Sequence, residues 1–317
     1  MPSIARFVFA TLVCVAFCGS ASHSQESLQP VLSTQEYIAR IDADDIALPQ
    51  RLERQVGFLE QNPQVALVGS SLNNVDVSGR HLATWLLPTA DREIRERLFG
   101  LRDLPLCHVA LVFRTEVFRA VNAYRSAFLH AEDYDFWLRI AERWQVANLP
   151  EPLVNVRRRA HSVSSVNTRQ QVISSLGAWA ASAIRRAGGR DPIDQEEPVT
   201  RELLTSMGVS DAVFEEHLIG VYLYWIDVML QSSDGAGALR VMREALESQP
   251  WRHISKSLLA NTWLAAARIY SRQGRYLRSV KAIARAIATR PVVAGRPIKR
   301  IAGRLRLFNN GAALPEN

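Results

Sequence analysis

Cysteine is scarce in this sequence, with three residues among 317. Cys14 and Cys18 lie in one apolar stretch near the N-terminus, so Cys107 stands alone in the rest of the chain. A single thiol excludes an internal disulfide there, and it also excludes a zinc site built from clustered cysteines. The chemistry of this protein therefore has to come from other side chains.

Low-complexity runs are absent as well. Hydrophobic residues make up 48% of the chain and charged residues 22%, which are ordinary values for a globular protein. This composition excludes disorder of the whole chain, and the length suffices for two modest domains.

The apolar stretch from Phe7 to Cys18 is twelve residues long, too short to span a bilayer comfortably. Arg6 precedes it and small residues follow at 19–22, so residues 1–25 have the layout of a secretory signal peptide. A mis-called start or a shifted reading frame explains the stretch equally well. The first interpretation predicts an exported protein, and the second predicts a cytoplasmic or membrane-peripheral one.

Acidic residues are nearly absent from the C-terminal part. Residues 251–317 hold 14 Lys and Arg side chains and a single acid, Glu316. The simplest interpretation of this basic tail is a set of solvated helix faces. The other interpretation is that this basic tail binds an anionic membrane surface. Nucleic acid is not expected, because no aromatic interleaving or recognised motif accompanies the charge.

Strand and helix patterns alternate over residues 26–170, which predicts an α/β layer there. The expected strands are 36–41, 65–69, 81–87 and 111–113, and the expected helices are 49–62, 91–99 and 133–144. The last of these helices is predicted to be amphipathic.

From about residue 170 only helical patterns follow, so a second region of helices is expected over residues 171–317. Six of its residues fall near the spacings of a tetratricopeptide repeat: Trp263, Tyr270, Gly274, Tyr276, Ala286 and Pro291. One clear repeat is fewer than a free-standing solenoid needs. Helical hairpins packed against the rest of the chain are therefore one interpretation, and a small partner-binding surface is the other.

Three acidic residues, Asp42, Asp44 and Asp45, come directly after the first expected strand. Carboxylates so close in sequence offer hard oxygen ligands to Mg²⁺ or Mn²⁺. A solvated turn or a helix cap would have the same residues, so the cluster alone leaves both interpretations open.

Two further groups could do chemistry. Glu132 and Asp133 open the helix expected at 133–144, where a carboxylate serves either as a cap or as a general base. The run from Arg157 to Ser164 contains three consecutive arginines and His161. Such a run suits a diphosphate and a metal, or it is a solvated basic loop.

The order of these pieces is specific. The run from Tyr37 to Asp45, followed by Pro49-x-Arg51-Leu52, resembles the metal-binding strand end of family 2 glycosyltransferases. Then come His108 with Phe113-Arg114, the run Glu132-Asp133-Tyr134-Asp135-Phe136-Trp137-Leu138-Arg139, and the Arg/His/Ser run. The resemblance covers residues 36–164. It implies a GT-A-type, Rossmann-like α/β sheet domain, N-terminally truncated because the strand–helix unit that grips the nucleotide base has no room before Asp42.

The resemblance also implies an activity, namely metal-dependent, inverting transfer of a sugar from a nucleotide-sugar donor to a hydroxyl of a saccharide or lipid-linked acceptor. Asp42 and Asp44, with Asp45 a close alternative, would hold Mg²⁺ or Mn²⁺. Asp133 would be the base, and His161 and Arg158 would lie near the diphosphate. A non-catalytic remnant and a helical partner-binding protein are the alternatives.

Overall fold

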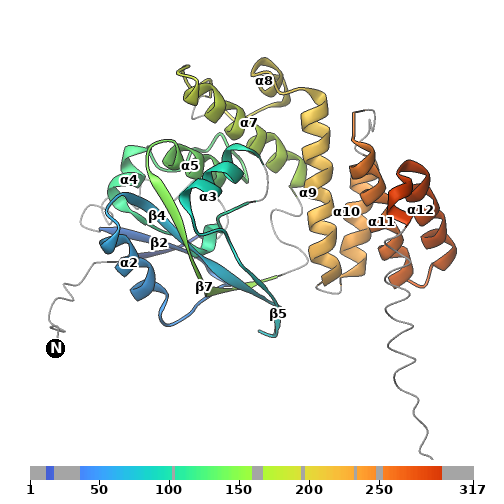
Figure 1. Cartoon of the computed structure of the whole chain (residues 1–317), viewed down its shortest axis with the longest axis horizontal. Coiled ribbons are helices and arrows are strands. Elements are labelled where there is room, and N and C mark those ends of the chain that lie inside the picture. The colour runs from blue at the N-terminus through green and yellow to red at the C-terminus, as the bar shows by residue number, and fades with distance from the viewer. Residues whose placement is uncertain are drawn as a thin grey trace, which may run out of the picture. The chain divides into compact units, whose positions relative to one another are not determined.

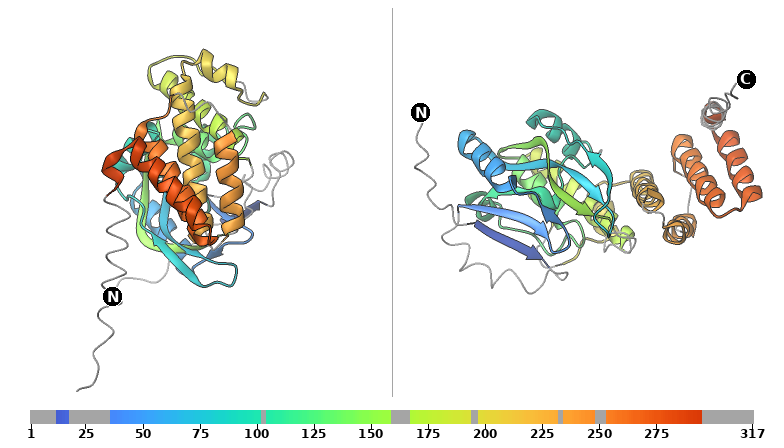
Figure 2. Two further views of the ribbon diagram at one scale, coloured as in Figure 1. Left: turned by 90° about the vertical axis from the view of Figure 1, so that its right-hand side faces the viewer. Right: turned by 90° about the horizontal axis from the view of Figure 1, so that it is seen from below.

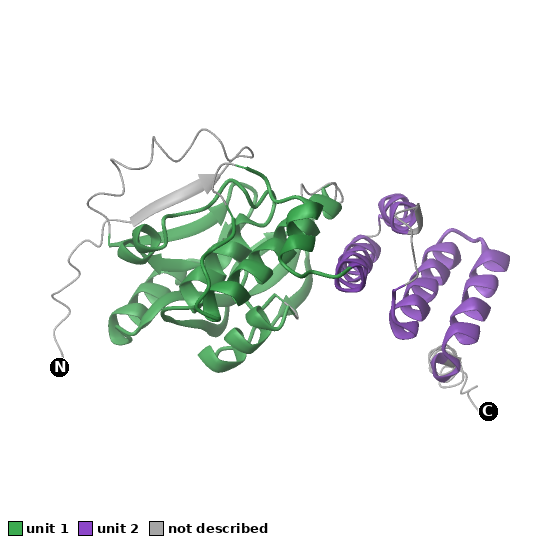
Figure 3. Ribbon diagram, turned by 90° about the horizontal axis from the view of Figure 1, so that it is seen from above, with its two compact units in different colours: residues 1–210 green, residues 211–317 purple. Residues whose placement is uncertain are grey.

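A computed structural model of the chain describes residues 12–17, 36–101, 104–158, 167–193, 197–231, 234–247 and 253–294. The chain divides into two compact units, Met1–Ser210 and Asp211–Asn317 (Figure 3). The first unit contains a mixed seven-stranded sheet with helices, as the α/β prediction requires. The elements described in the second unit are all helical.

The strands of the sheet unit are β1 (Leu12–Phe17), β2 (Tyr37–Asp42), β3 (Ile46–Ala47), β4 (Val65–Val75), β5 (His81–Trp85), β6 (Val112–Arg114) and β7 (Gln145–Arg157). Its helices are α2 (Arg51–Gln61), α3 (Asp91–Phe99), α4 (Thr115–Ala120), α5 (Glu132–Ala141), α7 (Thr168–Arg186) and α8 (Arg201–Ser206), with a 3₁₀ turn η1 (His108–Ala110) (Figure 1). The strand order is β1-β2-β6-β4-β7-β3, and β5 pairs with β4. β4 and β7 run parallel, whereas β6 is antiparallel to both of its neighbours.

The two faces of the sheet carry different helices, because successive side chains of a strand point to opposite sides. Val112 of β6 joins a buried cluster with Val68 and Leu59, on the side that α2 covers. Phe113, the next residue, instead has its ring 5.1 Å from that of Phe136 in α5. This alternation places α2 on one face of the sheet and α5 on the other.

Several expected elements are present near their predicted bounds, and α3 coincides with the predicted helix 91–99. The helix expected at 133–144 is α5, which begins at Glu132 and ends at Ala141. Its apolar side is buried as an amphipathic helix requires, but its polar side does not reach solvent either. Every residue from Tyr134 to Ala141 is buried, because α7 covers the side of α5 that would otherwise face water.

The long strand β7 was not predicted. Pro150 and Pro152 interrupt its pattern, and proline cannot donate to a strand ladder. The pairing with β4 shifts register around Ser71, opposite these prolines, so the strand continues past them. As a consequence Arg157 is the last residue of β7 and not part of a loop.

β1 comes from the apolar stretch that was expected as a leader. It pairs in parallel with β2, from Leu12 opposite Tyr37 to Phe17 opposite Asp42. Its pairing covers one edge of β2, which would otherwise present unpaired backbone groups. The leader itself stays a prediction.

The sheet unit extends past the boundary expected at residue 170. α7 packs on α5, the indole N–H of Trp179 donates to the carbonyl of Phe99 at 2.9 Å, and Arg185 pairs with Glu142 at 2.7 Å. Because these contacts run to α3 and α5, α7 belongs to the unit that ends at Ser210. The change from mixed to helical sequence patterns therefore precedes the structural boundary.

The helical unit contains α9 (Asp211–Gln231), α10 (Gly235–Glu247), α11 (Lys256–Arg272), α12 (Tyr276–Thr289) and a short 3₁₀ turn η2 (Pro291–Ala294). α11 and α12 form an antiparallel hairpin, whose turn contains Gly274 at a φ of 71° (Figure 2). A helical hairpin was predicted at this place, and its assignment as a tetratricopeptide repeat stays a prediction. Within the described ranges, no helix has both the length and the apolar character that a membrane crossing requires.

Candidate active site

The three aspartates predicted as metal ligands converge at the end of β2. Asp42 is its last residue, and the backbone N–H of Asp45 donates to the Asp42 carbonyl at 3.1 Å, which closes a tight turn through Asp44. One carboxylate oxygen from each of the three lies within 4.8 Å of the others, and all three residues are half-buried. Such a set of oxygen donors fits a divalent ion such as Mg²⁺ or Mn²⁺.

The surroundings of Asp45 show that the three carboxylates repel one another. Burial, together with the negative charges of Asp44 and Asp42, raises the pKa of Asp45 to about 6. The backbone N–H of Arg157, which donates to Asp45 Oδ1 at 2.8 Å, and the charge of Arg158 oppose the rise. A cation bound between the carboxylates would relieve their repulsion.

Arg51 of the Pro49-x-Arg51-Leu52 motif fixes the backbone beside this cluster. Its guanidinium is buried, and Nη2 donates to the carbonyls of Arg40 at 2.7 Å and Leu111 at 3.1 Å. Its Nε donates to Gln55 Oε1 at 3.0 Å. Arg51 is therefore a structural residue that ties α2 to the end of β2.

Arg40 and His108 connect the aspartate cluster to Asp133. The Arg40 Nη1 atom lies 2.6 Å from Asp42 Oδ1, and Arg40 Nε donates to His108 Nε2 at 2.8 Å. On the other side of the ring, His108 Nδ1 lies 3.9 Å from Asp133 Oδ2. Two direct contacts and one approach of 3.9 Å thus link Asp42 to Asp133.

Sequence reasoning gave His108 no role and did not single out Arg40. The sequence could have indicated that Arg40 is near the aspartates, because residues i and i+2 of a strand share one face. Arg40 therefore lies on the same side of β2 as Asp42. The signal for His108 was not available, because its partners come from β2 and α5, 68 and 25 positions away in sequence.

The protonation of His108 follows from its partners. Burial lowers the pKa of His108 well below its ordinary value, and the charge of Arg40 lowers it further, so the ring is neutral. Arginine only donates, so the Nε2 atom that accepts from Arg40 carries no proton and the proton is on Nδ1. Nδ1 is buried and makes no hydrogen bond within the described part of the chain. Its N–H thus lies on the side of the ring that is next to Asp133.

Asp133 is in the first turn of α5. Its Oδ1 accepts from the backbone N–H of Tyr134 at 2.7 Å, and 29% of its side chain is exposed. Burial raises the pKa of Asp133 to about 7, and the neighbouring Glu132 adds to the rise, while Arg40 opposes it. A carboxylate with a pKa near neutrality can take a proton and give it up again, which is what a general base requires.

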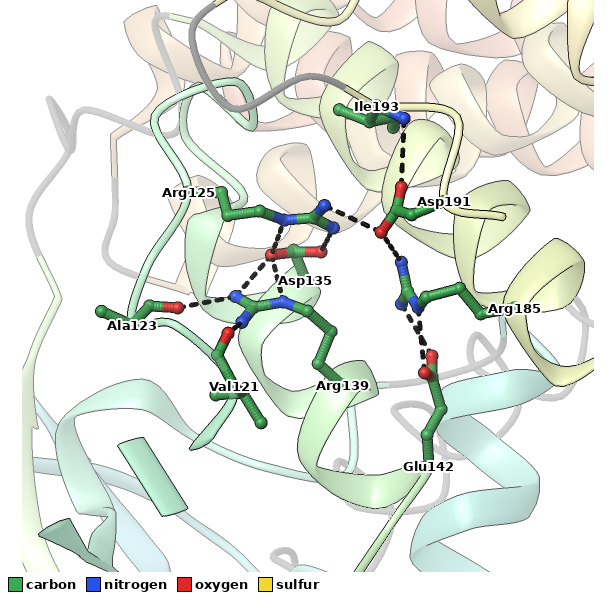
Figure 4. Close-up of polar contacts among 9 residues, drawn as sticks. All are labelled: Val121, Ala123, Arg125, Asp135, Arg139, Glu142, Arg185, Asp191 and Ile193. Carbon is green, nitrogen blue, oxygen red and sulfur yellow. Dashed lines mark hydrogen bonds and ion pairs between the residues drawn. The ribbon is translucent and has the colours of Figure 1, made fainter. Parts of the chain in front are cut away.

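Asp135, two positions further along α5, is fully buried between two arginines (Figure 4). It accepts from Arg139 Nε at 2.9 Å and from Arg125 Nε at 3.1 Å. Arg125 also pairs with Asp191 at 2.9 Å, and Asp191 pairs with Arg185 of α7 at 2.6 Å. This ion-pair network fixes α5, and thereby Asp133, to the segments around it.

Arg158 lies beside the aspartate cluster, and its charge lowers the pKa of Asp45. Its Nε donates to Asn74 Oδ1 at 2.6 Å, and its guanidinium carbon is 4.5 Å from the centre of the Trp85 ring. Arg158 is thus held by β4 and β5 next to the proposed metal ligands. His161, the other residue predicted near a diphosphate, lies outside the described residues.

An α/β sheet with carboxylates converging at one strand end and another carboxylate opening a nearby helix is the arrangement that the resemblance to glycosyltransferases implies. Residues 32–121 match the family described as Glycosyl transferase family 2, and the relatives below agree with it. The predicted resemblance to the family 2 glycosyltransferases is therefore confirmed for this part of the sheet unit.

The chain is 35% identical over 132 residues to the amylovoran biosynthesis glycosyltransferase AmsE of Erwinia amylovora, across 41% of this chain and 48% of that protein. It is 32% identical over 125 residues to the O-antigen biosynthesis glycosyltransferase WbnJ of Escherichia coli, across 38% and 46%. The chain thus spans about half the length of these curated relatives.

A solved mannosyltransferase from Pyrobaculum calidifontis, in complex with GDP-Man and Mn²⁺, aligns with 84% of this chain and 67% of its own. The identity is 15% and the TM-score is 0.36, which is too low a similarity to bear on ligands.

Proposed function

We propose that this chain transfers a sugar from a nucleotide-sugar donor to a hydroxyl of a saccharide or lipid-linked acceptor, with a divalent metal and with inversion at the sugar carbon. The observation that carries the proposal is the series of contacts from Asp42 through Arg40 and His108 to Asp133. It joins a candidate metal site to a candidate base across two elements that are distant in sequence.

In this proposal Asp42, Asp44 and Asp45 hold Mg²⁺ or Mn²⁺ together with the donor diphosphate. The ion, when bound, acts as a Lewis acid and offsets the negative charge of the leaving diphosphate. Arg158 lies beside the same carboxylates and adds a fixed positive charge for the diphosphate. His161 is proposed to lie near the diphosphate as well.

Asp133 is the proposed general base. Its carboxylate takes the proton of the acceptor hydroxyl as the hydroxyl oxygen forms its bond to the anomeric carbon, and the bond from that carbon to the diphosphate breaks on the opposite side. A single displacement of this kind inverts the configuration. His108 is a positioning residue, because its neutral ring lies between Arg40 and Asp133, with Nδ1 3.9 Å from Asp133 Oδ2.

The proposed donor also bears on the cellular compartment in which the protein acts. Nucleotide sugars are generally cytosolic, so the proposal favours the cytoplasmic or membrane-peripheral alternative. An exported chain would meet no donor, which is the situation that the remnant hypothesis describes.

Isothermal titration with UDP-, GDP- and dTDP-sugars in the presence of Mn²⁺ tests the proposal. At least one of them should bind, and Asp42→Ala should abolish its binding. Asp133→Asn should still bind the same donor but lose about 10²-fold or more in turnover, because only the base is removed. Glu96→Gln, on the exposed surface of α3, is the matched control and should change neither property. If a folded chain binds none of these donors, the remnant hypothesis is correct.

A further inference from the structure

α12 has two apolar faces, and only one of them is used by the fold. Ser279, Ala282 and Ala286 are buried against α11, and the Ser279 hydroxyl donates to the carbonyl of Ala267 at 2.9 Å. Small residues at this face let the two helices approach closely. The second face is therefore not needed to hold the hairpin together.

The second face points to solvent. Tyr276 is 69% exposed, Leu277 82% and Val280 62%. At 100° per residue these side chains lie on one side of the helix with Ala284 and Ala288, both of which are exposed as well. Large apolar side chains so exposed and so clustered usually mark a surface that another body covers.

Basic side chains border this apolar face. Arg278, Lys281 and Arg285 lie along one edge of it, and all three are exposed. Arg285 has its guanidinium carbon 4.7 Å from the centre of the Trp263 ring. For Arg278 and Lys281, no ion pair with a carboxylate is found among the described residues.

The charge around the helix is of one sign. From His253 to Ala294 the chain has eight Lys and Arg side chains and no acidic one. A partner that is itself an ordinary protein surface would carry both signs, whereas this face offers attraction to anions only. Apolar side chains flanked by cations, on a helix that lies flat, are the features of an interfacial membrane helix.

We propose that the exposed face of α12, formed by Tyr276, Leu277, Val280, Ala284 and Ala288 with the flanking Arg278, Lys281 and Arg285, docks on an anionic lipid bilayer. Leu277 and Val280 enter the boundary between headgroups and acyl chains, Tyr276 lies at the level of the headgroups, and the basic side chains contact lipid phosphates and carboxylates. The helix lies on the membrane and does not cross it. This inference goes beyond the proposed sugar transfer and does not depend on it.

Co-sedimentation of the full chain with vesicles tests the docking. Vesicles of phosphatidylcholine with phosphatidylserine should bind the protein, and vesicles of phosphatidylcholine alone should not. Raising the salt concentration should weaken the binding, because the cation–lipid attraction is screened. Equal binding to both vesicles, or none to either, would overturn the proposal.

Two pairs of substitutions separate the contributions. Arg278→Glu with Lys281→Glu should lower the partition coefficient at least about tenfold, since each basic residue near an anionic surface contributes measurably to binding. Leu277→Asp with Val280→Asp should lower it at least about tenfold through lost apolar burial. Val77→Asp, at a side chain 71% exposed in a turn of the sheet unit, is the matched control and should bind as the unchanged chain does.

A second copy of the chain is the competing occupant. If the face is a homodimer interface, light scattering will show a dimer that Leu277→Asp with Val280→Asp dissociates, and this result would overturn the membrane proposal. Nucleotide-sugar titration of the same variants keeps the two proposals distinct. Donor binding should be unchanged in them, because the aspartate cluster is formed by residues of the sheet unit.

Discussion

Two carboxylates on α5 show how neighbouring residues of one motif acquire different roles. Asp133 is partly exposed and faces His108, whereas Asp135 is fully buried between Arg125 and Arg139. The sequence predicted a base at Asp133 through the family resemblance. It gave no basis for the role of Asp135, because a motif records which residues are present and not which arginines fold onto them.

The raised pKa of Asp133 predicts a pH dependence. The titratable or charged groups around it are Glu132, Arg40, His108, Cys107 and Tyr124. A base acts when ionised, so activity should rise with pH and be half-maximal at about 7. Glu132→Gln removes a negative charge that raises this pKa, so the midpoint should move to lower pH. Carbon-13 NMR of the Asp133 carboxyl measures the midpoint without substrate, and a midpoint near 4 in the unchanged protein would contradict the prediction.

The state of His108 can be observed directly. Nitrogen-15 NMR should show a neutral ring with its proton on Nδ1, because Arg40 Nε donates to Nε2. Burial keeps the pKa of His108 well below its ordinary value, so the signal should stay that of a neutral ring at pH 6. Arg40→Met should remove the preference for this tautomer. A ring protonated on Nε2 in the unchanged protein would show that the Arg40 contact does not form in solution.

At the scale of elements, the sequence predicted best the helices and strands whose bounds depend on their own residues and not on a neighbour. The α3 bounds were predicted correctly, and the predicted strand and helix around the three aspartates are present as β2 and α2. β7 was missed because Pro150 and Pro152 break its pattern, and only the neighbouring β4 shows that the strand continues. The link between Asp42 and Asp133 could not be predicted from either segment alone, because it runs through Arg40 and His108.

The buried charge network of α5 predicts a large loss of stability on neutralisation. Asp135→Asn leaves Arg125 and Arg139 buried with one anionic partner fewer, which should lower the free energy of unfolding by about 3–5 kcal/mol. Denaturant unfolding followed by circular dichroism measures this loss.

The exposed pair of Arg92 and Glu96 on α3 is the control for that experiment. Glu96→Gln should cost no more than about 0.5 kcal/mol, because solvent screens an exposed i, i+4 pair. Similar losses from both substitutions would contradict the structural role assigned to Asp135.

At the scale of the whole molecule, the chain combines a sheet unit and a helical unit of different charge character. The acidic cluster belongs to the first, and the uniformly basic stretch from His253 to Ala294 belongs to the second. Composition revealed this asymmetry without any structure. It did not place the boundary, because α7 has a purely helical pattern and yet packs on α5.

Metal binding predicts a change in the stability of the folded protein. A ligand that binds only the folded state stabilises it by about 2.7 kcal/mol at a hundred times its dissociation constant, so Mn²⁺ should raise the Tm and EDTA should reverse the rise. Asp44→Asn should remove the effect. Without metal the same variant should be as stable as the unchanged protein or more so, because the Asp44 carboxylate raises the pKa of Asp45. A Tm that Mn²⁺ leaves unchanged would contradict a metal site.

The central claim is that the metal ligands and the base share one site, and paramagnetic broadening by Mn²⁺ tests it most directly. In protein labelled with nitrogen-15 at histidine, Mn²⁺ should broaden the His108 signal beyond detection, because Arg40 contacts both Asp42 and His108. Mg²⁺ should not broaden it, and Asp42→Asn with Asp44→Asn should abolish the effect of Mn²⁺. A His108 signal that stays sharp while Mn²⁺ is bound would show that the ion and Asp133 lie in different places.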